Sequence, residues 1–396
     1  DEIIGAADQA WQLSGTNNQI TANNIAFTAV EKATNGTITG TTGVDAFTVS
    51  DAANTNKQVT ANAILFSNIS AVNGSGNTDT VTGSLTWNLL STGFNASGIN
   101  FTGVETVNST AGGTLNGTAL ADQFTLGNNQ QVKVQSGSVT FNNIAAVAGG
   151  NGTDEIIGAA NQAWQLSGTN NQITANNIAF TAVEKATNGT LAGTETADEF
   201  TLVGTKQVKA NEITFGNVAE VAGGNGTDEI IGAADQAWQL SGTNNQITAN
   251  NIAFTAVEKA ANGTVTGTSG IDAFTVSDEA GTENQVTANA ILFSNISSVT
   301  AGDNADTVSG SNTWNLLSTG FETSGINFFD IVTANSATAG TLTGTTLADS
   351  FLLVADNKVN VKTTTFTGVT NVAGGNGEDE IIGAADQAWQ LSGTNN

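Results

Sequence analysis

Residues 1–36 read DEIIGAADQAWQLSGTNNQITANNIAFTAVEKATNG, and their apolar side chains alternate with small or polar ones. Trp11 is followed by Leu13, and Ile25 by Phe27. A period of two is typical of a β-strand with one buried face. Helix is disfavoured because β-branched residues dominate the apolar runs and glycine interrupts them repeatedly. The segment therefore predicts several short strands, with a bend near Val30, which follows Phe27 by three positions.

The same pattern returns along the whole chain in two alternating types of unit. Units of the first type carry tryptophan, at positions 11, 87, 164, 238, 314 and 389. Units of the second type carry phenylalanine in the matching context, at positions 47, 124, 200, 274 and 351. A second series of phenylalanines runs in phase with both, at positions 27, 66, 101, 141, 180, 215, 254, 293, 328 and 366. The chain thus consists of about eleven units of about 37 residues, here called Trp units and Phe units.

A period of 20 to 50 residues indicates a solenoid, a propeller or an array of small domains. A propeller closes at about four to eight blades, and a sandwich domain needs about 100 residues. We therefore predict an all-β, right-handed parallel β-solenoid that forms one continuous array over residues 1–396. The sequence leaves open whether a unit makes one wide coil or two narrow ones. Because residues 1–18 recur letter for letter at 379–396, we expect a fragment of a longer repetitive protein.

Stacking of successive units leads to three further expectations. Trp and Phe should share one interior column, and the second series of phenylalanines should form another. Asp45 and its equivalents alternate with neutral residues, so carboxylates should be spaced about 10 Å apart along the stack, which avoids like-charge pairs. Asn-Gly pairs such as Asn35-Gly36 should form tight turns between strands. The pairs Glu31-Lys32, Glu184-Lys185 and Glu258-Lys259 are interpreted as solvated charges.

The composition excludes many kinds of chemistry. The chain has 9 basic and 35 acidic residues and a net charge of -26, and it lacks His, Cys, Met, Pro, Tyr and Arg. Without His and Cys it has no classical catalytic triad, no cysteine nucleophile and no usual zinc site. An acidic, arginine-free surface repels nucleic acid, and no apolar run approaches the roughly 18 residues of a membrane helix. We expect no enzyme, no nucleic-acid partner and no membrane span.

Several segments resemble repeats of very large bacterial surface proteins. GTALADQFTL (117–126), SVTFNNIAAVAGGNGTDEI (138–156) and GTETADEFTLVG (193–204) are similar to the β-strand repeats of filamentous haemagglutinin-like adhesins. The similarity covers essentially the whole chain. It implies a secreted, rod-like protein at the cell surface whose repeats act as stalk or fibre, and it implies no catalytic residues.

A second resemblance raises calcium as a ligand. GGNGTDEII (149–157 and 223–231) and GGNGEDEII (374–382) resemble the GGxGxDxUx motif of repeats-in-toxin β-rolls, in which Asp and carbonyl oxygens of tandem copies hold Ca²⁺. The candidate ligands are Asp154, Asp228 and Asp379. The copies are not in tandem, whereas Ca²⁺ needs six to eight oxygens, more than one copy can supply. The alternative interpretation, a glycine-rich corner whose Asp caps turn amides, is favoured, and folding is expected without a cofactor.

Together these observations predict a non-catalytic structural repeat that forms the shaft of an extracellular bacterial adhesin or fibre. Its expected partners are further copies of itself and components of the cell surface or matrix. The alternatives are a secreted calcium-binding β-roll and, with less support, an ice-binding solenoid, because threonines are frequent but scattered among Asn, Asp and Lys.

Overall fold

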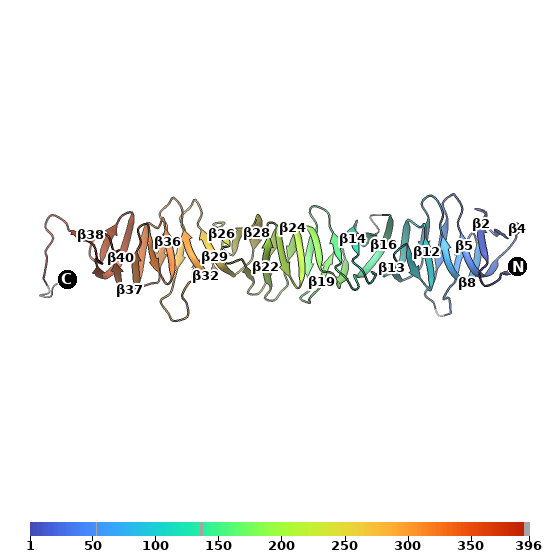
Figure 1. Ribbon diagram of the computed structural model, residues 1–396, viewed down its shortest axis with the longest axis horizontal. Helices are drawn as coiled ribbons and strands as arrows, with labels where there is room; N and C mark the ends of the chain where they lie inside the picture. Colours follow the sequence, from blue (N-terminus) through green and yellow to red (C-terminus); the bar gives the residue numbers. More distant parts are fainter. Residues whose placement is uncertain (53, 135–137, 392–396) are drawn as a thin grey trace. The chain divides into compact units, whose positions relative to one another are not determined.

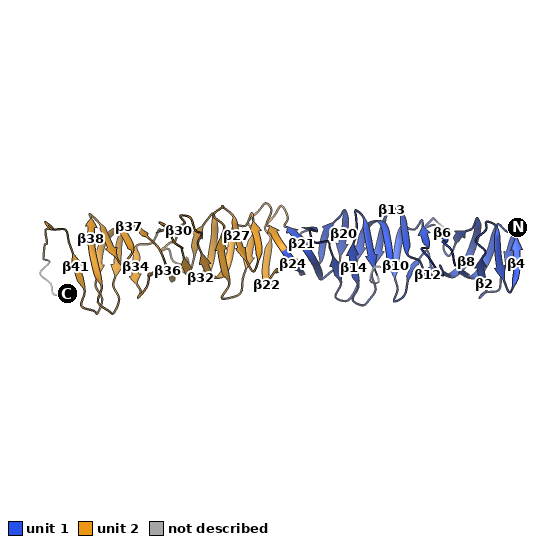
Figure 2. Ribbon diagram, turned by 90° about the horizontal axis from the view of Figure 1, so that it is seen from above, with its two compact units in different colours: residues 1–192, 209–218 blue, residues 193–208, 219–396 orange. Residues whose placement is uncertain are grey.

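The structure is a computed structural model that describes residues 1–52, 54–134 and 138–391. Two compact units divide the chain, and Figure 2 shows them in different colours. Unit 1 comprises 1–192 and 209–218, and unit 2 comprises 193–208 and 219–396. All regular elements of the described residues are β-strands. No helix among these residues has the length and apolar character that crossing a membrane requires.

The strands are short, except for a few of eight to eleven residues (Figure 1). Those up to residue 192 are β1 Glu2–Ile4, β2 Ala10–Leu13, β3 Gln19–Ala22, β4 Ile25–Thr28, β5 Lys32–Thr39, β6 Ala46–Val49, β7 Val59–Ala61, β8 Ile64–Asn73, β9 Thr80–Thr82, β10 Thr86–Leu89, β11 Phe94–Ala96, β12 Ile99–Thr102, β13 Thr106–Asn116, β14 Gln123–Leu126, β15 Gln131–Val134, β16 Val139–Ala148, β17 Glu155–Ile157, β18 Ala163–Leu166, β19 Gln172–Ala175, β20 Ile178–Thr181 and β21 Lys185–Ala192. The later strands are β22 Glu199–Gly204, β23 Gln207–Ala210, β24 Ile213–Ala222, β25 Glu229–Ile231, β26 Ala237–Leu240, β27 Gln246–Ala249, β28 Ile252–Thr255, β29 Lys259–Thr266, β30 Ala273–Thr275, β31 Val286–Ala288, β32 Ile291–Thr300, β33 Thr307–Ser309, β34 Thr313–Leu316, β35 Phe321–Thr323, β36 Ile326–Phe329, β37 Thr333–Thr343, β38 Ser350–Ala355, β39 Lys358–Val361, β40 Thr364–Ala373 and β41 Glu380–Ile382.

In unit 1 these strands form two hydrogen-bonded ladders that share the long strands. The first ladder has the order β1–β5–β8–β7–β6–β9–β13–β16–β15–β14–β17–β21. The second ladder has the order β4–β3–β2–β5–β8–β12–β11–β10–β13–β16–β20–β19–β18–β21. A long strand such as β5 pairs through its first half in one ladder and through its second half in the other.

Unit 2 repeats this arrangement. Its first ladder runs β22–β25–β29–β32–β31–β30–β33–β37–β40–β39–β38–β41. Its second ladder runs β28–β27–β26–β29–β32–β36–β35–β34–β37–β40. In each complete repeat of a ladder, one short strand such as β7, β11 or β31 runs antiparallel to the strands on both sides of it.

Parallel neighbours show how much chain one turn consumes. Thr80 of β9 pairs with Thr106 of β13, and Ala46 of β6 pairs with Thr80 of β9. In each case the chain between the two partners is most of one repeat unit rather than half of it, which favours the wide coil. The prediction of an all-β solenoid with stacked parallel coils is confirmed.

The antiparallel strands were not predicted from the sequence. In the first Trp unit, β2, β3 and β4 run back and forth as neighbours. The turn between β3 and β4 is the pair Asn23-Asn24, whose φ angles of 49° and 61° are both positive. Two consecutive left-handed residues form the type I′ turn, which suits the twist of a hairpin and which asparagine tolerates well. The segment NQITANNIAFT is thus a hairpin within the coil.

The core consists of rows of stacked apolar side chains, but Trp and Phe begin different rows. In the second ladder Trp11 lies against Ile38, followed by Val72 and Phe101. In the first ladder Phe47 begins an equivalent row of Val81, Val107 and Phe141. The expectation of one shared column is wrong, because successive units start on opposite ladders. The strand that precedes Trp11, β1, belongs to the first ladder. The second half of β5, which precedes Phe47, belongs to the second ladder.

Asn35-Gly36 differs from its predicted role as a turn between strands, whereas the pair Asn151-Gly152 lies between β16 and β17 as predicted. Asn35 and Gly36 lie inside β5, with φ angles of 73° and 102°, where the register shifts and the strand passes from one ladder to the other. A Cβ on Gly36 would stand 1.9 Å from the carbonyl oxygen of Gln9, so the position requires glycine. The indole Nε1–H of Trp11 donates to the Asn35 carbonyl oxygen at 2.6 Å. This pair is therefore a bulge that is fixed by the core tryptophan.

Candidate functional site: buried carboxylate columns

Aspartates occupy the position just before many strands of the first ladder, and most of them are buried. Asp79, Asp154, Asp228 and Asp306 are 0% exposed. Further buried aspartates at this corner are Asp45, Asp198, Asp272 and Asp349. Burial of a carboxylate is costly unless hydrogen bonds compensate for the lost hydration, so the partners of each oxygen determine the properties of this corner.

In the Phe units the aspartate closes its own turn. Both the backbone N–H and the hydroxyl of Thr41 donate to Oδ2 of Asp45, at 2.6 Å and 3.0 Å. The Thr and the Asp are four residues apart in the motif GTxxxD, which recurs in every Phe unit. The same two bonds form in the pairs Thr118–Asp122, Thr194–Asp198, Thr268–Asp272 and Thr345–Asp349.

The carboxylates of successive coils are joined through backbone amides. Asp45 N–H donates to Oδ1 of Asp79 at 2.8 Å, and Asp79 N–H donates to Oε2 of Glu105 at 2.8 Å. These residues precede β6, β9 and β13, which are consecutive strands of the first ladder. We call such a set a carboxylate column. The same column forms from Asp122, Asp154 and Glu184 in unit 1, and from Asp198, Asp228 and Glu258 in unit 2.

One oxygen of the middle aspartate lacks any partner. Oδ2 of Asp79 is buried and accepts no hydrogen bond, and the same holds for Oδ2 of Asp154, Asp228 and Asp306. The turn that precedes Asp79 explains the difference from Asp45. Ser75 stands where Thr41 stands in the Phe unit, but it has a φ of 89° and its N–H donates to Asn73 Oδ1 instead.

This environment raises the pKa of Asp79, Asp154 and Asp228. Burial raises the pKa of Asp79, and the nearby charges of Asp45 and Glu105 raise it further, although the bond from the Asp45 amide opposes the change. Burial likewise raises the pKa of Asp154 and of Asp228, each with two flanking carboxylates. Desolvation and like charges both disfavour the ionised form.

Two expectations about charge are corrected by this geometry. Carboxylates of successive units were expected to be separated by a neutral neighbour, but Asp45 and Asp79 precede adjacent strands. They do so because the Phe unit and the next Trp unit each place an aspartate in the first ladder. Glu184 and Glu258 were interpreted as solvated charges, yet each accepts the amide of a buried aspartate. The spacing of 30 residues from Asp154 to Glu184, and again from Asp228 to Glu258, was the signal that could have revealed the columns.

The three calcium candidates occupy this corner. Asp154 and Asp228 are the middle members of two columns, whereas Asp379 is exposed and accepts the amide of Asp349 through Oδ1 at 3.0 Å. A Cβ on Gly149 would stand 2.6 Å from Asp154 Oδ2 and 2.1 Å from the Ala182 carbonyl oxygen, so the glycine backbone lies close to both atoms. In the described part of the chain, no group of three or more acidic side chains is placed to hold a metal ion. Calcium therefore stays an untested expectation.

A different aspartate, Asp51, anchors a loop outside the columns. Ser84 and Ser97 donate their hydroxyls to Asp51 at 2.8 Å and 2.9 Å, and the Leu85 amide donates as well. Partial burial opposes ionisation of Asp51, but these hydrogen bonds outweigh it and lower its pKa.

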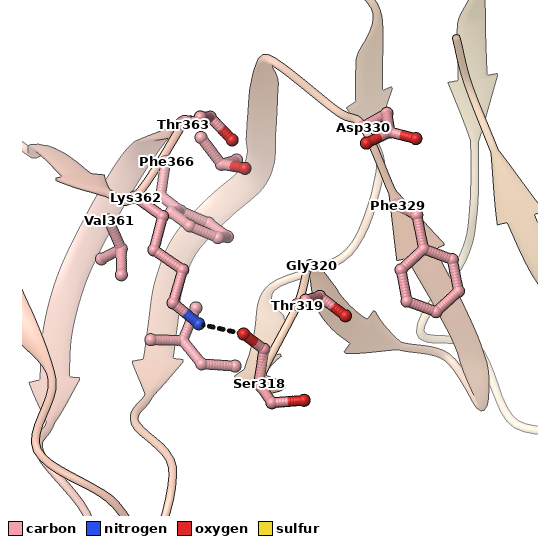
Figure 3. A pocket seen from close by; sticks show the side chains of 11 residues that line it. Ser318, Thr319, Gly320, Phe329, Asp330, Val361, Lys362, Thr363 and Phe366 are labelled. Atoms are coloured by element: carbon pink, nitrogen blue, oxygen red, sulfur yellow. Dashed lines mark hydrogen bonds between the residues drawn. The ribbon is translucent and has the colours of Figure 1, made fainter.

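The depressions found on the surface of the described residues are lined mainly by neutral side chains. Figure 3 shows one of about 230 Å³, where the loop between β34 and β35 is short and Lys362 reaches across the gap. Its ammonium donates to the carbonyl oxygens of Leu317 and Ser318 at 2.9 Å and 2.7 Å. Asp330 also lines the depression. Because the ammonium of Lys362 donates to backbone carbonyls, Lys362 holds two loops together.

Comparison with protein-family models, with curated proteins and with solved structures finds no match to this chain. Fold and site therefore define the chain as a β-solenoid whose coils are joined by buried carboxylate columns.

Proposed function

We propose that this chain is a non-catalytic structural repeat that forms the shaft of an extracellular bacterial adhesin or fibre. The observation that carries the proposal is the continuity of the backbone ladders and apolar rows within each unit. Each coil contributes the same kinds of side chain to the same rows, so every added coil buries its apolar face against its neighbour. In such a protein, stability is a sum of coil and interface contributions, and length can be extended by repetition.

The distribution of polar chemistry supports a structural role over catalysis. The acidic residues that gather at the corner recur from repeat to repeat, whereas glycosidase sites use one unique carboxylate pair in a cleft. The hydrogen bonds of these carboxylates hold turns and adjacent coils together. Lack of Cys and Met suits an oxidising environment, since both side chains are readily oxidised.

Self-association of shafts is part of the proposal. Four of the five GTxxxD turns expose a large apolar side chain: Val44 and Leu120 in unit 1, and Ile271 and Leu347 in unit 2, with 67% to 73% of each exposed. Single exposed apolar residues are ordinary, but their recurrence at one turn gives each shaft a repeated contact point for a second copy. The negative charge of the chain would restrain this contact at low ionic strength.

An in-phase deletion tests the structural role. Removal of residues 45–121 joins Val44 to Asp122, and both belong to a GTxxxD turn. We expect the variant to fold with the same β-sheet content per residue, because Asp122 can accept the bonds from Thr41. Deletion of residues 45–102, which breaks the phase, is the matched control and should misfold. Equal behaviour of both deletions, or reproducible polysaccharide hydrolysis by the purified intact chain, would overturn the proposal.

A further inference from the structure

The column of Asp45, Asp79 and Glu105 concentrates three carboxyl groups on three adjacent strands. Asp79 is 0% exposed, and its Oδ2 is buried without a hydrogen-bond partner. The charged groups that act on it come from both neighbouring strands and are Asp45, before β6, and Glu105, before β13. Neither ion pair found among the described residues involves a member of this column. The column therefore holds more negative charge than its hydrogen bonds balance.

A backbone carbonyl oxygen lies near the orphan oxygen of Asp79. A Cβ on Gly74 would stand 2.5 Å from Asp79 Oδ2 and 2.0 Å from the carbonyl oxygen of Gly103. Both oxygen atoms thus lie close to Gly74. An ionised carboxylate and a carbonyl repel each other, whereas a protonated carboxyl group has an O–H that can be donated.

We propose that the Asp45–Asp79–Glu105 column is a proton-binding device that stabilises its coils as the surroundings become acidic. A proton from solvent adds to Oδ2 of Asp79 and yields the neutral acid. Oδ1 continues to accept the Asp45 amide, and the new O–H can turn toward the Gly103 carbonyl. Uptake of the proton removes the central charge from a row of three, so the coils gain stability without any change of fold. The inference does not rest on the proposed shaft function.

The direction of the pH effect follows from linkage. The folded state holds its proton at a higher pH than the unfolded chain, whose Asp has a pKa of 3.8. The stabilisation by Asp79 is therefore fully present below pH 3.8 and is lost as pH rises through the folded-state pKa. Acidification from neutral pH should tighten this part of the solenoid, whereas acid loosens most proteins.

The chain contains a matched control for the third carboxylate. Asp306 is equally buried, accepts the Asp272 amide at 2.7 Å and has the same unpartnered Oδ2. However, Val332 stands in the position of Glu105. The Val332 amide donates to the carbonyl oxygen of Asp306, just as the Glu105 amide donates to the carbonyl oxygen of Asp79. Because Val332 is 38% exposed, a glutamate can be introduced there without burial.

Hydrogen exchange of individual backbone amides tests the device in the intact chain. The probes are the amides of Asp45 and Asp272, measured from pH 8 down to the unfolded-state pKa of 3.8 with excess chelator and corrected for intrinsic exchange rates. In the wild type, protection of the Asp45 amide should rise as pH falls, by up to about tenfold for each unit by which the folded pKa exceeds the unfolded one. Asp79→Asn should remove this pH dependence and keep protection high at pH 8, because an amide can both accept from Asp45 and donate from the orphan position.

Two charge variants separate a proton device from a merely structural aspartate. Glu105→Gln keeps an acceptor for the Asp79 amide and should flatten the pH dependence at Asp45. Val332→Glu should create such a dependence at Asp272. Wild-type protection at Asp45 that is constant or falls on acidification would overturn the proposal. So would Asp79→Asn protein that is less protected than the wild type at pH 8.

Discussion

Replacement of Trp164 by alanine tests the interior rows most severely. Trp164 lies in β18, is 1% exposed and stacks against Leu191 of the neighbouring coil. Its indole Nε1–H donates to the carbonyl oxygen of Asn188 at 2.6 Å and thereby holds the pair Asn188-Gly189 of β21, whose φ angles are 72° and 101°. The substitution would open a cavity and leave this carbonyl without its donor.

The expected loss follows from both contacts. Removal of a buried Trp side chain lowers the free energy of unfolding by roughly 3–5 kcal/mol. Because the hydrogen bond is lost as well, we expect a total loss near the upper end of this range. For a unit of about 200 residues, each kcal/mol lowers the melting temperature by about 2–4 °C, so the shift should be on the order of 10 °C.

Thermal unfolding followed by circular dichroism provides the assay. Trp389→Ala is the matched control because the surrounding sequence AWQLSG is identical, whereas Trp389 is 58% exposed. That variant should unfold within about 0.5 kcal/mol of the wild type. A Trp164→Ala protein that melts within about 2 °C of wild type, on a scale of about 2–4 °C per kcal/mol, would refute the assigned packing. Equal losses in both variants would refute it as well.

Two further outcomes concern charge and metal. Asp51→Asn should destabilise the chain by roughly 0.5–1 kcal/mol at pH 7 after allowance for solvent screening. Because the pKa of Asp51 is lowered below 3.8, the difference in stability from the wild type should persist above pH 3.8 and vanish as pH falls through the folded-state pKa. A difference that grows on acidification would contradict this expectation. Excess chelator should leave the far-ultraviolet circular dichroism unchanged, and a β signal that collapses and is restored by Ca²⁺ but not by matched ionic strength would show that Asp154, Asp228 or Asp379 is a ligand.

The fold class could be predicted from the sequence because burial in a strand leaves a local trace. Alternation of Trp11 with Leu13 and the fixed spacing of the aromatic residues both arise from a single repeated geometry. The antiparallel strand β3 escaped prediction, since Gln19–Ala22 has the same alternation in either strand direction. Its turn also consists of two asparagines rather than Asn-Gly.

The carboxylate columns could be predicted only in part. The GTxxxD turn is local, so the pairing of Thr41 with Asp45 is visible in the spacing of the motif. The hydrogen bond from the Asp79 amide to Glu105 depends on how many residues one turn contains. This number differs between the turn that joins β6 to β9 and the turn that joins β9 to β13. Without that length, Glu184 and Glu258 look like ordinary surface charges beside a lysine.

The most direct test of the proposed shaft is the length of single particles in negative-stain electron micrographs. Residues 45–121 contribute five strand steps to the first ladder, from β6 to β14. At about 4.8 Å per step this is about 24 Å of length. We expect elongated particles of uniform width, shortened by about 24 Å in the in-phase deletion variant. Globular particles, or particles whose length does not change with the deletion, would contradict it.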